Sequence, residues 1–133
     1  MRVVLSIPML ALVIAAYLLA GLGGSLMVDA DVFYFTMPSS AVLALRVGDF
    51  FTLAGLVALF IEMIKSARSS VSTVVDHMLS TLTLVAAIVA FLLLGYCGTA
   101  PFFLLTVMAL IDVIAGFSVS IFSARRDYSI NNG

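Results

Sequence analysis

The stretch that decides the fold is AVLALRVGDFFTLAGLVALFIEMIK, residues 41–65. It is long and apolar enough to cross a bilayer, since a spanning helix needs about 20 mostly apolar residues. It nevertheless carries Arg46, Asp49 and Glu62. Charged side chains inside a spanning helix are costly unless they find a partner, a water-filled cavity or the interface. The rest of the chain is therefore expected to be arranged so that these charges are tolerated.

The composition indicates a membrane protein. Of the 133 residues, 64% are hydrophobic and 10% are charged, whereas soluble domains contain about 45–50% apolar and about 25% charged residues. The net charge of −1 lacks the basic excess that nucleic-acid binding needs. One cysteine cannot form an intramolecular disulfide, and one histidine is too few for a conventional zinc site unless carboxylates or other protomers contribute. We expect no metal, no other cofactor and no nucleic-acid partner.

Four apolar segments predict an all-α fold, a four-helix transmembrane bundle forming one domain. The helices are expected at about 3–24, 41–65, 71–94 and 101–123, with an outer loop at 25–40 and a polar cytoplasmic tail at 124–133. The first segment has a rival interpretation as a signal peptide with Arg2 in its n-region. Its apolar run is longer than the usual ~7–15 residues and no A-x-A site follows, which favours a retained helix.

The charges predict the orientation of these helices. With four spans, the basic residues gather on one side, namely Arg2, Lys65, Arg68, Arg125 and Arg126. The acidic residues Asp29 and Asp31 fall on the other side, beside aromatic residues that suit the membrane interface. By the positive-inside rule both termini are expected to be cytoplasmic, in a bacterial inner membrane.

A cluster of embedded charges is the first candidate site. Arg46 and Asp49 share one face of the second predicted helix, and Asp112 lies near the centre of the fourth. At ~1.5 Å per residue, Asp49 lies about 13 Å and Asp112 about 16 Å from the outer ends of their helices, so the three residues can meet if these faces oppose each other. Such a cluster suits either a proton or cation site or a structural lock in which one aspartate stays protonated.

A polar face in the cytoplasmic half is the second candidate site. It contains Glu62, Asp76, His77 and Ser80. One interpretation is a cytoplasmic vestibule in which His77 titrates near neutral pH. The other is an interfacial helix start, where Asp76 favours the helix dipole and the hydroxyl groups bond to the backbone.

Small residues form a possible packing surface. Ala44, Gly48 and Gly55 lie on one stripe of the second predicted helix, and Gly116 lies on the same side of the fourth helix as Asp112. Small residues at such spacing let another helix approach closely. This pattern predicts assembly into a homo-oligomer or a larger membrane complex.

The residues 46–70, RVGDFFTLAGLVALFIEMIKSARSS, the pair Asp76-His77 and the segment 110–128, LIDVIAGFSVSIFSARRDY, resemble small four-helix bacterial inner-membrane proteins of no assigned activity. The resemblance covers the predicted second to fourth helices and implies a fold and a location, without a reaction. The chain also lacks the CxxC of quinone-linked thiol oxidoreductases and the first-helix glutamate of small multidrug exporters.

The sequence thus predicts a small integral membrane protein without catalytic residues, which acts as a structural or accessory subunit. The alternative is a small oligomeric channel or proton-coupled transporter that uses the embedded cluster of Arg46, Asp49 and Asp112. The expected partners are membrane lipids together with further copies or other membrane chains.

Overall fold

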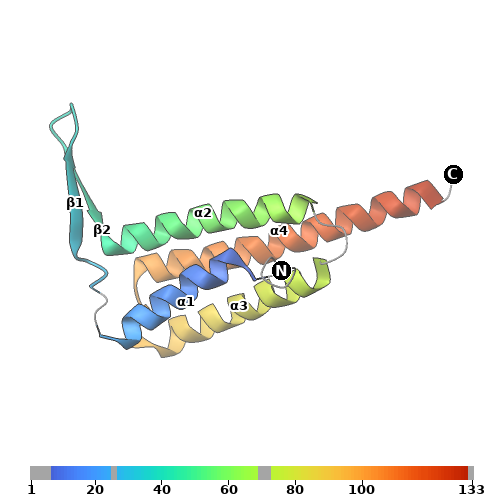
Figure 1. Ribbon diagram of the computed structural model, residues 1–133, viewed down its shortest axis with the longest axis horizontal. Coiled ribbons are helices and arrows are strands. Elements are labelled where there is room, and N and C mark those ends of the chain that lie inside the picture. Colours follow the sequence, from blue (N-terminus) through green and yellow to red (C-terminus); the bar gives the residue numbers. More distant parts are fainter. Residues whose placement is uncertain (1–6, 25–26, 69–72, 132–133) are drawn as a thin grey trace.

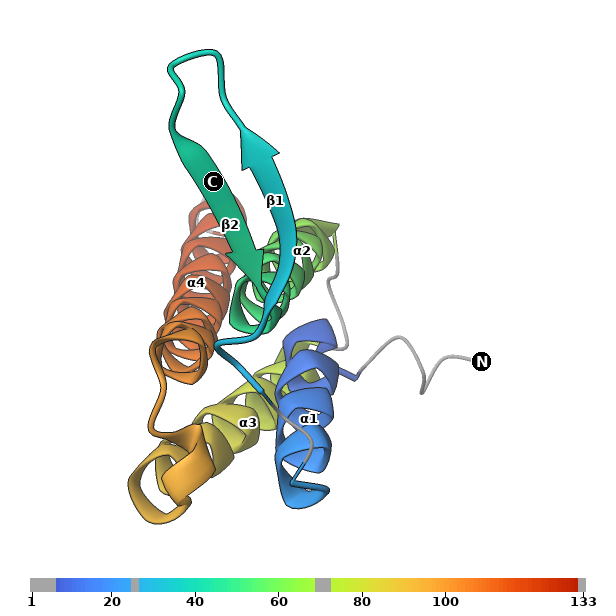
Figure 2. The ribbon, with the colours of Figure 1, turned by 90° about the vertical axis from the view of Figure 1, so that its left-hand side faces the viewer.

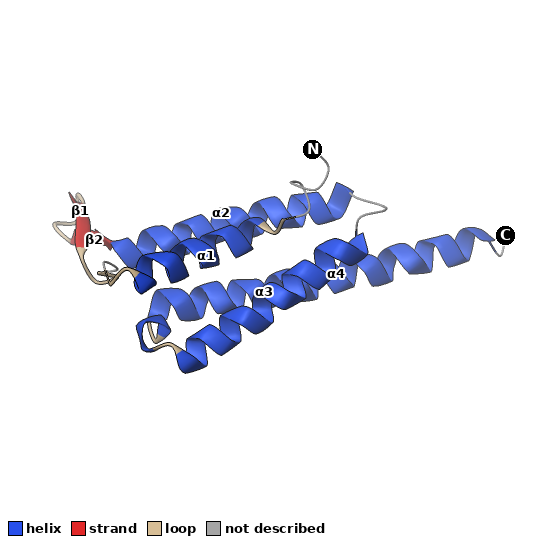
Figure 3. Cartoon of the chain, turned by 60° about the horizontal axis from the view of Figure 1, so that its bottom comes forward, coloured by secondary structure: helices blue, strands red, loops and turns tan. Residues whose placement is uncertain are grey.

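The computed structural model describes residues 7–24, 27–68 and 73–131. It contains α1 (Met9–Leu22), β1 (Asp31–Thr36), β2 (Val42–Arg46), α2 (Val47–Arg68), α3 (Thr73–Leu93), a short 3-10 helix η2 (Gly95–Cys97) and α4 (Ala100–Asn131). The helix α4 packs against both α2 and α3, and α1 lies mainly against α2 (Figure 1). The two strands form a hairpin at one end of the bundle, and α4 extends beyond the other end (Figures 1 and 3).

Within the described residues, three helices are long and apolar enough to cross a membrane. They are Val47–Ala67, Val74–Leu93 and Ala100–Ile130, with mean hydropathies of 1.9, 1.9 and 2.3. The apolar helix α1 has 14 residues and at ~1.5 Å per residue is about 21 Å long, shorter than the ~30 Å hydrocarbon core. The prediction of a mostly helical fold is thus confirmed, and three of the four predicted spans correspond to helices long and apolar enough to cross a membrane.

The prediction of an all-α fold is wrong for the segment around residues 31–46. Part of the predicted outer loop 25–40 and the first residues of the predicted helix 41–65 form the antiparallel hairpin β1–β2. Its strands are rich in Val, Phe, Tyr and Leu, which fit a pleated surface well. At the turn, Met37 N–H donates to the Ala41 carbonyl at 2.8 Å, and Ser40 adopts a positive φ of 65°. Pairing with β1 therefore keeps residues 42–46 out of the helix.

The other predicted boundaries also shift. The first helix begins after Pro8 and ends at Leu22, where the segment passes into a turn with Gly24 at a φ of 65°. The predicted tail 124–133 continues α4 as far as Asn131. The predicted starts of the first and third helices at 3–6 and 71–72, and residues 25–26 and 132–133, lie outside the described residues.

The hairpin joins α2 without a linker. Strand β2 ends at Arg46 and α2 begins at Val47. Three backbone N–H groups at this junction have acceptors: Arg46 N–H donates to Asp49 Oδ2 at 2.8 Å, Val47 N–H to the Ala30 carbonyl at 3.1 Å, and Gly48 N–H to the Val28 carbonyl at 3.0 Å. The first N–H groups of a helix have no partner within the helix, so these bonds both cap α2 and hold the hairpin against it.

The most completely buried part of the core surrounds Tyr17 of α1. Its ring centroid lies 5.1 Å from that of Phe51 and 4.9 Å from that of Phe102. Its hydroxyl group lies 2.6 Å from Thr99 Oγ1 and donates to the Tyr96 carbonyl at 3.3 Å. A buried tyrosine needs such a polar partner. These contacts tie α1 to α2 and α4 near the hairpin end.

Candidate functional site

Three polar or charged side chains are buried among the described residues: Glu62, Ser80 and Asp112. They come from α2, α3 and α4 respectively. From the hairpin-side ends of their helices they lie at similar depths, about 22, 20 and 18 Å, at ~1.5 Å per residue. We call Glu62, Lys65, His77, Ser80 and Asp112 the buried polar cluster, since all five interact with one another directly or through Asp112.

Glu62 joins the start of α1 to α2. The helix α1 follows Pro8, which provides no side-chain cap, and the backbone N–H of Met9 donates to Glu62 Oε1 instead. Lys65 Nζ donates to both carboxylate oxygens of Glu62, at 3.1 and 3.3 Å, and reaches the Ile7 carbonyl at 3.5 Å. Negative charge is favourable at a helix N-terminus. Glu62 therefore caps α1 from the neighbouring helix.

Asp112 links α4 to α3. The hydroxyl group of Ser80 donates a hydrogen bond to the Asp112 carboxylate, and Glu62, Lys65 and His77 are close enough to interact with it electrostatically. The cluster contains two carboxyl groups, Glu62 and Asp112, and one lysine, so acidic groups exceed lysines by one. Burying an uncompensated carboxylate is strongly unfavourable. One proton or one monovalent cation would make the cluster neutral.

His77 is a member of the buried polar cluster that also reaches the groove between α3 and α4. Its Nε2 atom is 2.7 Å from Ser120 Oγ, and its ring stacks on Phe117 with a centroid distance of 5.6 Å. Gly116 faces the ring so closely that a Cβ atom there would overlap it. His77 also lines an apolar groove of about 590 Å³ between α3 and α4. The imidazole thus interacts electrostatically with Asp112 and also lines the groove.

Three residues of the second predicted polar face interact with Asp112. Glu62, Ser80 and His77 come together around Asp112, whereas Asp76 lies in the first turn of α3, where a carboxylate favours the helix dipole. Lys65 and Ser120 complete the site and were not among the predicted site residues. Their spacing in the sequence could have identified them, because residues three or four apart on a helix are neighbours. Lys65 is three residues after Glu62, and Ser120 is four residues after Gly116 on α4.

The predicted cluster of Arg46, Asp49 and Asp112 is not assembled. Since α2 begins at Val47, Arg46 and Asp49 lie at the end of the helix instead of deep inside it. Gly48 packs against Pro101 in the first turn of α4, and Asp112 is about 16 Å further along that helix at ~1.5 Å per residue. The hairpin is the physical reason, because it takes up the residues that the prediction assigned to the outer turns of the helix.

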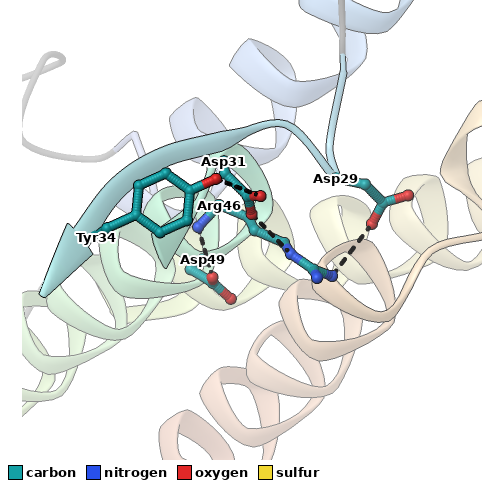
Figure 4. Close-up of polar contacts among 5 residues, drawn as sticks. All are labelled: Asp29, Asp31, Tyr34, Arg46 and Asp49. Atoms are coloured by element: carbon teal, nitrogen blue, oxygen red, sulfur yellow. Dashed lines mark hydrogen bonds and ion pairs between the residues drawn. The ribbon is translucent and has the colours of Figure 1, made fainter. Parts of the chain in front are cut away.

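Arg46 belongs instead to an exposed group at the base of the hairpin, made of Asp29, Asp31, Tyr34, Arg46 and Asp49 (Figure 4). Arg46 Nε lies 3.2 Å from Asp31 Oδ1, and its Nη1 lies 4.0 Å from Asp29 Oδ1. Tyr34 donates to Asp31 Oδ2 at 2.8 Å, and this hydrogen bond to the carboxylate raises the pKa of the Tyr34 phenol. We call these five residues the hairpin-base group.

The glycines of the predicted packing stripe contact α4 of the same chain. Ala44 lies in β2 opposite Tyr34 and not on a helix, which corrects its assignment to the stripe. Gly48 packs against Pro101 and Val28, and Gly55 packs against Leu105 and Met108 of α4. These glycines therefore allow close approach of α2 and α4, in line with the role of small residues in membrane helices. They no longer point to a contact between copies.

No family model matches the sequence, and neither a curated protein nor a solved structure matches the chain. No family is therefore identified for the chain, and the resemblance of residues 46–70 and 110–128 extends only to a small helical protein with three long apolar helices. What the structure establishes is a small, mostly helical protein with three membrane-length apolar helices, a buried polar cluster and a projecting hairpin.

Proposed function

We propose that this chain is a non-enzymatic integral membrane protein of the bacterial inner membrane, which acts as a structural or accessory subunit. The observation that carries the proposal is that each of the two buried carboxylates bonds to another helix of the same chain. Glu62 binds Lys65 and the start of α1, and Asp112 accepts a bond from Ser80. Both carboxylates connect helices of the same chain, as expected of a structural lock.

The exposed surface of the helices and of the hairpin suits contact with lipid and with other membrane chains. Large apolar side chains remain exposed along α2, α3 and α4, and also on the hairpin. Large exposed apolar surfaces mark membrane or protein contact sites. Lipid covers part of this surface, and the accessory role assigns the remainder to further copies or to a larger complex.

The proposed orientation places both termini in the cytoplasm. The C-terminal part of α4, which carries Arg125 and Arg126, points away from the hairpin (Figure 1). The hairpin end carries Asp29 and Asp31, close to Arg46. This asymmetry agrees with the positive-inside rule. Fusions of a periplasm-active reporter to the C-terminus should be inactive, and fusions within the 37–41 turn should be active; the reverse pattern would overturn the orientation.

Purification from native membranes in a mild detergent tests the subunit role. Native mass spectrometry should show a species well above the 14.1 kDa of a single chain, containing either several copies or additional membrane proteins. A matched preparation in a harsh detergent should give the single chain. A single chain in both detergents, at all concentrations, would contradict the proposal.

A second candidate function is proton or cation transfer through the buried polar cluster. It is favoured by the composition of the cluster, which has two carboxyl groups and one lysine, and by His77, which interacts with Asp112 and lines the groove. In liposomes, this function predicts a pH-dependent flux that Asp112→Asn abolishes and Asp49→Asn leaves unchanged. No wild-type flux between pH 5 and 8, or equal flux in both variants, would exclude this role for Asp112.

A further inference from the structure

The hairpin has two chemically different faces. Phe33 pairs with Leu45 and Phe35 pairs with Leu43, and paired residues in an antiparallel ladder lie on the same face. The first face therefore consists of four large apolar side chains. The second face, reached by moving one residue along each strand, carries Tyr34, Ala44, Thr36 and Val42. We call the first face the Phe-Leu face.

The hairpin runs across the direction of the helices. Figure 1 shows its strands roughly perpendicular to α2 at the end of the bundle, and Figure 2, seen along the bundle, shows them extending well past the helices. Arg46 and Val47 are consecutive residues of β2 and α2, and the bonds of Val47 and Gly48 to residues 28–30 fix the junction. When α2, α3 and α4 span a bilayer, the hairpin therefore lies along its surface, over lipid.

The chemistry of the hairpin matches the interfacial region of a bilayer. Phe33 and Phe35 are each 53% exposed and Tyr34 is 62% exposed, and aromatic side chains are favoured at headgroup depth. The outer edges of a two-stranded sheet carry unpaired backbone N–H and C=O groups, which hydrocarbon does not tolerate. Headgroups and water can satisfy them. The charged hairpin-base group likewise remains at the aqueous boundary.

We propose that the hairpin is a lipid-binding element that lies flat in the outer headgroup region, with its Phe-Leu face toward the hydrocarbon. An isolated two-stranded hairpin is at best marginally stable in water. The lipid surface would cover one face and keep the exposed strand edges from pairing with other chains. The proposal rests on the membrane placement of α2–α4 given under Proposed function.

The absence of tryptophan from the sequence allows a direct test. Single tryptophans are introduced as Phe35→Trp on the Phe-Leu face and Thr36→Trp on the opposite face. Ile114→Trp, at a position of α4 that is 56% exposed, controls for membrane insertion. Each full-length variant is reconstituted in phosphatidylcholine vesicles containing brominated lipids, and fluorescence quenching is compared with quenching by aqueous iodide.

The expected result is strong lipid quenching of Ile114→Trp and Phe35→Trp, with Thr36→Trp quenched at least about twofold less by lipid and more by iodide. Lipid quenching of Ile114→Trp without that of Phe35→Trp would overturn the hairpin proposal alone. Equal lipid quenching of residues 35 and 36 would overturn the assignment of faces. Failure of lipid quenching at residue 114 would overturn the membrane placement itself. Emission at residue 35 that responds to protein dilution and not to lipid would assign the face to a second copy, against this proposal.

Discussion

The hairpin-base group and the buried polar cluster contain the same kinds of side chain in opposite environments. Around Arg46, the side chains of Arg46, Asp29 and Asp31 are 54%, 96% and 35% exposed. In the cluster, the side chain of Glu62 is 8% exposed and that of Lys65 is 24% exposed. Exposed ion pairs are worth about 0–1 kcal/mol because water and salt screen them, whereas breaking a buried pair leaves an uncompensated charge. The comparison predicts that similar substitutions have very different effects.

The largest effect is expected for Glu62→Ala. It leaves Lys65 without its carboxylate and the Met9 N–H without an acceptor, so the free energy of unfolding should fall by about 3–5 kcal/mol. Glu62→Gln keeps an acceptor for the N–H group and should lose less. Unfolding in mixed micelles, followed by circular dichroism, measures both. A loss for Glu62→Ala no larger than that for Arg46→Ala would break the comparison.

A smaller effect is expected for Gly116→Ala. The new methyl group would overlap the His77 ring and displace it from Ser120, which should cost about 1–3 kcal/mol, reduced by the higher helix propensity of alanine. The matched control is Gly95→Ala, where a Cβ atom meets no neighbour within 4 Å; it should stay within about 0.5 kcal/mol of the wild type. Equal stability of the two variants would show that the position of the His77 ring against Gly116 and Ser120 does not contribute to the free energy of unfolding.

Asp49→Ala should lower the free energy of unfolding less than Gly116→Ala and more than Arg46→Ala. It removes the acceptor of the Arg46 N–H group at the start of α2, and capping bonds contribute about 1 kcal/mol. Asp49→Asn retains an acceptor and serves as the control. Hydrogen exchange of the Arg46 amide should increase in the alanine variant and change little in the asparagine variant. Protected exchange in both would mean that another acceptor holds this amide.

The smallest effect is expected for Arg46→Ala. It removes the contacts with Asp31 and Asp29, and the free energy of unfolding should fall by less than about 1 kcal/mol. This loss should shrink further when the salt concentration is raised, because exposed charges are screened. The same unfolding measurement at low and high salt tests it. A salt-independent loss of several kcal/mol would mean that Arg46 is buried in the membrane-bound protein.

The segments that could be predicted from the sequence are those whose signal is local. The apolar runs that form α2, α3 and α4 are visible in hydropathy alone. The hairpin was missed because AVLALR at 41–46 is as apolar as the helix that follows it. Whether such a run is strand or helix depends on pairing with β1 across the turn at 37–41, and periodicity in a short apolar run does not decide this.

The same division holds for the site. By itself, the sequence determined the membrane-length helices and the polar ends of α2 and α3 that contain Glu62, His77 and Ser80, because composition and spacing along each helix are local properties. Only the tertiary structure decided that Asp112 joins these residues and that Arg46 and Asp49 lie apart at the hairpin base. The reason is physical: which side chains meet depends on where α2 begins and on how the helices are rotated against each other. The pairing of β1 with β2 sets where α2 begins.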